Sequence, residues 1–81
     1  MATKKTAWVK RVPPDPDNMN ERRGEWAGAA LQEYQRQTGA DIEDAVSDLM
    51  ADLMHWCDQN NQEFDTELQR AHSHYTRETD A

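Results

Sequence analysis

Residues 41–59 read DIEDAVSDLMADLMHWCDQ, and this stretch decides the fold. Its apolar residues recur at spacings of three and four, which is the pattern of an α-helix. The apolar stripe is too wide for a helix with one neighbour, so we expect this helix to be the central element. Asp41 is its expected N-cap, and Glu43 and Asp44 place negative charge in the first turn, where it complements the helix dipole. The stripe consists of Ile42, Ala45, Val46, Leu49, Met50, Leu53, Met54, Trp56 and Cys57.

An earlier helix is predicted over residues 19–37. Asn18 is its expected N-cap, and Glu21, three residues later, completes a capping box. Gly39 is expected to end the helix as the residue just beyond its last turn. The face that we expect this helix to bury consists of Trp26, Ala27, Ala30, Leu31 and Tyr34.

Two glycines, Gly24 and Gly28, lie within this helix, and each costs it about 1 kcal/mol relative to alanine. Two interpretations of the pair stay open. Their spacing lets another helix approach closely, or they are surface glycines that the helix tolerates.

Asn60 and Asn61 break the central helix, and a third helix is predicted after them, with one face formed by Phe64, Leu68, Ala71 and Tyr75. Short loops indicate that the three helices are antiparallel neighbours. The expected fold is therefore all-α, a compact three-helix domain with helices at about residues 19–37, 41–59 and 63–78.

Residues 1–18 are predicted to form an extended basic arm, and residues 19–81 form the helical domain. Residues 1–12 carry a formal charge of +4 and the remaining residues carry −11, which together give −7. Three prolines within residues 13–17 exclude a helix there and favour an extended or turning backbone. Trp8 gives the arm an apolar group with which to dock.

Length and composition limit the class of protein. A chain of 81 residues allows one domain with a modest core. Its one cysteine excludes an internal disulfide framework and suits a reducing compartment. No segment approaches the roughly 18 uninterrupted apolar residues of a membrane span, and no apolar signal-peptide core follows Met1. We therefore expect a soluble cytoplasmic protein.

Between Arg36 and Arg70 the chain carries nine carboxylates and no lysine or arginine. Uncompensated like charge weakens a folded state and is useful mainly where something positive must be attracted. The strongest chemical candidate is a ladder on the polar face of the central helix, where steps of four, four and three align the side chains. Such a ladder suits a hard divalent cation, and a solvated face opposite an apolar stripe is the alternative. The ladder consists of Asp44, Asp48, Asp52 and His55.

Other chemical groups give weaker signals. His72 and His74 are two residues apart on a helix, so they point in different directions and do not chelate one ion together. Cys57 lies on the apolar side of the central helix with no basic residue near to lower its pKa, which indicates a small core residue. Trp8 lies among four basic residues and could stack on a base, but phosphate would repel the −11 body. Direct nucleic-acid binding is not expected.

Most of the chain carries a resemblance to a known group of proteins. It rests on Asp48-Leu49-Met50, His55-Trp56, Phe64-Asp65, Leu68, Ala71 and His74-Tyr75, and extends back through residues 13–17 and Glu25-Trp26-Ala27. These residues resemble a group of small uncharacterised helical proteins of bacteria and their mobile elements. The resemblance implies a bacterial setting, in a plasmid or phage, and no activity.

A second, partial resemblance is more chemical. From Asp48 to Arg77 the chain is similar to the later half of MazG-type nucleotide pyrophosphohydrolases, all-α enzymes that hold Mg²⁺ with EExxE on one helix and ExxD on the next. The first motif falls on residues 21–25 and the second on residues 45–48, where Glu21, Glu25 and Asp48 match and Arg22 and Ala45 replace the other two carboxylates. A hairpin centred on Gly39 also sets Glu25 roughly 9 Å from Asp48 along the axis. We therefore take the likeness as evidence for a helical hairpin and discount the enzyme.

Three functions remain as hypotheses. The first is an interaction protein whose Asp44, Asp48, Asp52 and Asp58 bind a positively charged protein surface, for example as a nucleic-acid-mimicking inhibitor that occupies the groove of a nucleic-acid-binding protein. The second is a degenerate metal-dependent nucleotide pyrophosphohydrolase, with Glu21, Glu25 and Asp48 as Mg²⁺ ligands. The third is a structural homodimer with no external ligand, because the chain has few apolar residues with which to build the core of a monomer.

Overall fold

The computed structural model describes residues 12–80, and three α-helices make up most of that range: α2 (Asn20–Thr38), α3 (Ile42–Gln59) and α4 (Phe64–Thr79). The predicted fold class, an all-α three-helix domain, is confirmed. Each helix begins one residue later than predicted, and its end differs by no more than one residue, which is within the usual uncertainty of helix ends. Residues 1–11, which hold most of the predicted basic arm, lie outside the described residues.

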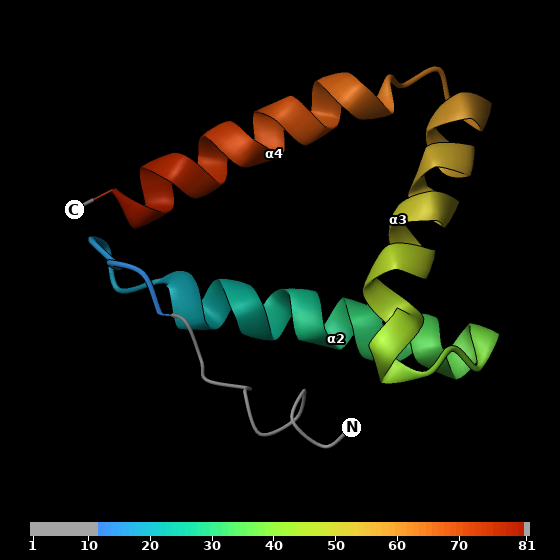
Figure 1. Ribbon diagram of the computed structural model, residues 1–81, viewed down its shortest axis with the longest axis horizontal. Coiled ribbons are helices and arrows are strands. Elements are labelled where there is room, and N and C mark those ends of the chain that lie inside the picture. The colour runs from blue at the N-terminus through green and yellow to red at the C-terminus, as the bar shows by residue number, and fades with distance from the viewer. Residues whose placement is uncertain (1–11, 81) are drawn as a thin grey trace, which may run out of the picture.

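The three helices form the sides of an open triangle (Figure 1). α3 contacts both α2 and α4, which confirms its place as the central element. Each short loop joins two consecutive helices at their ends, and the helices diverge from that corner (Figure 1). The expectation that the helices are antiparallel neighbours was therefore wrong for the consecutive pairs. The start of α2 and the end of α4 meet again at the third corner.

The N-terminus of α2 is capped by residues that the sequence did not indicate. The N–H of Met19 donates to Asp17 Oδ1 at 3.1 Å, and the N–H of Asn20 donates to Asp15 Oδ1 at 3.2 Å. Asn18 instead has a positive φ of 59° and its own N–H donates to the carbonyl of Asp15. The predicted capping role of Asn18 was wrong, because two aspartates of the proline-rich segment already serve the free amides of the first turn.

The other helix ends follow the sequence more closely. Gly39 has a φ of 75°, and its N–H donates to the carbonyl of Gln35 at 2.7 Å, as expected for a glycine that ends a helix. Asn61 has a φ of 60° just after α3, which confirms the predicted break. Asp41 occupies the N-cap position of α3 in an extended conformation, but its side chain makes no capping hydrogen bond. Its predicted position was right and its predicted contact was wrong.

Very little of the described chain is buried. Only Ala45, which is fully buried, and Cys57, which is 6% exposed, form a core within residues 12–80. The predicted burial of Trp26 and Trp56 was wrong, because these side chains are 58% and 53% exposed. The reason is the divergence of the helices, which leaves each apolar face without a neighbour along most of its length. Within the described range, no helix has both the length and the apolar character needed to cross a membrane.

A cluster of polar side chains closes the third corner. The Arg23 guanidinium donates to both carboxylate oxygens of Asp17, at 3.0 and 2.8 Å, and its Nε lies 3.3 Å from Glu78 Oε2 on α4. The side-chain amide of Asn20 donates through Nδ2 to the backbone carbonyl of Glu78 at 2.8 Å. The hydrogen bond from Arg23 lowers the pKa of Asp17 to about 2. The two free ends of the triangle are thus joined by hydrogen bonds and ion pairs.

We expect Arg23→Gln to lower the melting temperature by a few degrees, because it removes the contact to Asp17 and Glu78. Arg22→Gln is the matched control, since within residues 12–80 Arg22 pairs only with the exposed Glu25 on its own helix, at 3.6 Å. Thermal unfolding followed by circular dichroism at 222 nm measures both variants. Equal melting temperatures for the two would contradict a role for this corner.

The same contact predicts a dependence on pH. The folded-state pKa of Asp17, about 2, lies below the ordinary value of 3.8. Its contribution to stability is therefore complete above about pH 4 and is lost as the pH falls towards 2. Wild type and Arg23→Gln should differ in melting temperature at pH 5 and converge near pH 2. A constant difference across this range would show that Asp17 is not the partner that matters.

Candidate acidic interface

Four aspartates lie along one side of α3. Asp44, Asp48, Asp52 and Asp58 are all exposed, and His55 is exposed between the last two. The steps between them keep these side chains on the face of the helix opposite Val46 and Leu53. From the first aspartate to the last, the face extends about 21 Å along the helix axis. We call these four aspartates the acidic face. The predicted ladder and Asp58 thus share one surface.

Within residues 12–80, no ion pair involves an acidic residue of α3. The helix carries five carboxylates and no lysine or arginine. The basic residues of the described range are engaged elsewhere: four of them form ion pairs with other acids, and the fifth, Arg77, bonds to the ring of His74. The four are Arg22, Arg23, Arg36 and Arg70. The negative charge of α3 therefore meets solvent without a cation of the described range beside it.

One member of the acidic face is held against α2. The hydroxyl of Tyr34, a half-buried side chain, donates to Asp52 Oδ2 at 2.5 Å. This hydrogen bond, with burial and the nearby charges of Asp52 and Asp48, raises the pKa of Tyr34 to about 12. Asp52 therefore links α3 to α2 through this hydrogen bond, while Asp44, Asp48 and Asp58 have no comparable partner within residues 12–80.

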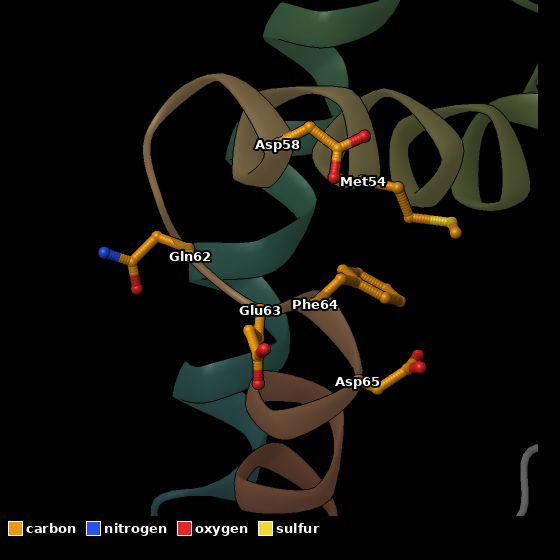
Figure 2. A pocket seen from close by; sticks show the side chains of 6 residues that line it. All are labelled: Met54, Asp58, Gln62, Glu63, Phe64 and Asp65. Carbon is orange, nitrogen blue, oxygen red and sulfur yellow. The ribbon is translucent and has the colours of Figure 1, made fainter.

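The acidic face ends at a hollow in the corner between α3 and α4. Figure 2 shows Met54 and Phe64 pointing to the same side of this corner, with the carboxylates of Asp58 and Asp65 on either side of them. The hollow has a volume of about 360 Å³ and opens to solvent. Its lining consists of Met54, Asp58, Gln62, Glu63, Phe64 and Asp65.

The hollow adds two carboxylates, Glu63 and Asp65, that were not among the predicted site residues. The signal was present in the sequence, because the break at Asn60 and Asn61 turns the chain and sets the start of α4 beside the end of α3. An apolar surface from Met54 and Phe64 between carboxylates suits a cationic side chain with an apolar stem.

The alternative metal ligands are not brought together. Among residues 12–80, no group of three or more histidine, cysteine, aspartate or glutamate side chains is placed to hold a metal ion. Glu25 instead lies 3.6 Å from the Nε of Arg22. Neither the set of Glu21, Glu25 and Asp48 nor the ladder on α3 therefore has the geometry of a metal site.

Comparisons of the chain with protein-family models, curated proteins and solved structures found no match. The chemistry of the acidic face therefore has to be judged from its own residues. Those residues present a row of exposed carboxylates that ends at a small hollow lined by both apolar and acidic side chains.

The Tyr34–Asp52 hydrogen bond predicts the ionisation of that tyrosine. In a Tyr75→Phe variant, where Tyr34 is the remaining tyrosine, absorbance at 295 nm should titrate near pH 12, above the ordinary 10.0. Its folded-state pKa is raised, so the hydrogen bond stabilises the fold fully below pH 10 and is lost as the pH rises through about 12. Adding Asp52→Asn should move the titration towards 10, and an unchanged midpoint would rule out this contact.

Proposed function

We propose that this protein is a small cytoplasmic interaction protein whose acidic face binds a positively charged surface of another protein. The observation that carries the proposal is the exposure of four aspartates along α3 with no arginine of the described range paired to them. Uncompensated charge of this kind destabilises a small domain and favours association with an oppositely charged surface.

The arrangement of the carboxylates supports an extended contact. Asp44, Asp48 and Asp52 follow one another at steps of four residues, or about 6 Å along the helix axis. A rigid row of negative charges is what a groove built for a nucleic-acid backbone attracts. In its most concrete form, the protein is an inhibitor from a mobile element that imitates a nucleic acid and occupies the groove of a nucleic-acid-binding protein. Its resemblance to small proteins of bacterial mobile elements supports this form.

The hollow at the α3–α4 corner gives the interface a specific anchor. An arginine or lysine side chain of the partner would lay its methylene groups against Met54 and Phe64 and place its charge between Asp58 and Asp65. Aromatic and thioether surfaces both accept such a stem, and the ring of Phe64 adds attraction for the cation. Asp58 is therefore both the last aspartate of the acidic face and a residue that lines the hollow.

Electrostatic steering is the expected advantage of this design. Complementary charge raises association rates at low salt and loses much of its effect at high salt. Binding through the acidic face should consequently weaken as salt rises, whereas binding through an apolar surface should not.

Asp48→Lys/Asp58→Lys should reduce binding to the partner at least a hundredfold, because two contacts turn from attraction to repulsion. These two substitutions do not remove the Tyr34–Asp52 hydrogen bond. A pull-down from nuclease-treated bacterial lysate, followed by mass spectrometry and by titration of the captured protein at low and high salt, measures the loss.

Glu21→Lys/Asp80→Lys is the matched control, because it makes the same change in net charge at exposed positions outside α3. This variant should bind as the wild type does. Equal capture by all three proteins, each with an intact helical circular dichroism signal, would refute the proposed interface.

A further inference from the structure

An apolar groove runs along the corner between α2 and α3. It has a volume of about 370 Å³, and none of its lining residues is charged or polar. The wall from α2 contains Gly24 and Gly28, and a Cβ added to either glycine would meet nothing within 4 Å. The backbone of α2 is therefore bare on this side. The full lining consists of Gly24, Ala27, Gly28, Leu31, Val46, Leu49, Met50 and Leu53.

Exposed apolar side chains also lie on α4. Leu68 and Tyr75 lie on the same side of α4 as Glu78, at steps of seven and three residues, and Glu78 contacts the start of α2. Leu68 is 47% exposed and Tyr75 is 55% exposed. Both side chains are therefore largely exposed on the side of α4 that also carries the contact to α2.

The lack of a closed core indicates what kind of partner covers this surface. Ala45 and Cys57 are the buried apolar residues of the described range. A domain held by so small a core lacks the buried area that offsets the conformational entropy of folding. A cover that is present whenever the chain folds would supply this area, and a second copy of the chain is the partner that we consider.

We propose that the α2–α3 groove is the interface of a homodimer, in which the same groove of a second copy packs against it about a two-fold axis. A two-fold contact uses one surface twice, so an apolar groove on one copy meets an apolar groove on the other. The bare backbone at Gly24 and Gly28 lets the partner's side chains approach α2 closely.

The exposed apolar side chains supply part of the area that a stable dimer needs. Five large apolar side chains are between 40% and 57% exposed, of which Val46, Met50 and Leu53 line the groove and Leu68 and Tyr75 lie on α4. At about 80 Å² each they supply roughly 400 Å² of apolar surface, whereas stable interfaces bury about 600–1,000 Å² per partner. In the dimer, the α2 wall of the groove and the polar residues around it would have to supply the remainder.

The distribution of charge permits this pairing. Two copies with a formal charge of −7 each repel one another, so a shared interface has to keep carboxylates away. The groove meets this need, because the acidic face lies on the opposite side of α3. A dimer formed through the groove would leave both acidic faces open to other proteins.

Val46→Lys should break the dimer, because it places an ammonium group in the apolar groove without a partner. The dissociation constant of the dimer should rise about a hundredfold or more. Ile42→Lys is the matched control. Val46 and Ile42 are both β-branched residues of α3, they are 57% and 56% exposed, and only Val46 lines the groove. Sedimentation velocity of the full chain across micromolar concentrations, with melting temperature as a function of concentration, measures both variants.

We expect wild type and Ile42→Lys to sediment with twice the chain mass of 9.4 kDa. Their melting temperatures should rise with protein concentration. Val46→Lys should sediment as a single chain, or unfold at concentrations where the control stays dimeric. A folded wild-type monomer would overturn the proposal, and if removal of residues 1–11 lowered its melting temperature, those residues would be the cover instead. A dimer that survives Val46→Lys would also overturn it.

This inference and the proposed function fail separately. Val46→Lys leaves the carboxylates of the acidic face unchanged, and Asp48→Lys/Asp58→Lys leaves the groove unchanged. Loss of dimerisation with retained capture of a basic protein, or the reverse, would therefore identify which of the two surfaces was wrongly assigned.

Discussion

Arg23 joins the two ends of the described chain. Its guanidinium binds Asp17, just before α2, and Glu78, in the last turn of α4. The other two corners are made by helices that follow one another along the chain, so their contacts are local. The third corner is different, because it brings together residues about 60 positions apart. The triangular arrangement therefore depends on a contact that is partly exposed to solvent and is weakened by salt.

The central helix serves two surfaces at once. Its apolar side forms the groove with α2, and its carboxylates project from the opposite side. Both surfaces follow from one periodic pattern, in which apolar residues and aspartates alternate at helical spacing. A change at one surface consequently need not disturb the other. Asp52 is the exception, since its hydrogen bond to Tyr34 links the acidic side of α3 to α2.

The sequence predicted the helices well and their packing poorly. Periodicity and Gly39 are local signals, so the three helices and their ends followed from them directly. The exposure of Trp26 and Trp56 was not predictable in this way, because the apolar pattern shows which face seeks a neighbour and not whether the same chain provides one.

The candidate site shows the same division between local and long-range information. The alignment of Asp44, Asp48, Asp52 and Asp58 required only helical geometry. The hydrogen bond from Tyr34 to Asp52 and the union of Asp58 with Asp65 around one hollow required the angles between helices. Those angles depend on contacts between distant residues such as Arg23 and Glu78. A local sequence pattern does not predict such contacts.

The capping of α2 has a consequence for where the folded unit begins. Asp15 and Asp17 precede every helix of the described range, yet their carboxylates accept hydrogen bonds from the first amides of α2, and Asp17 also holds Arg23. A shortened chain that started at Met19 would keep all three helices and lose both carboxylates. It would begin α2 with uncapped amides and leave Arg23 with Glu78 as its remaining acidic partner. The folded unit therefore begins within the proline-rich segment, no later than Asp15.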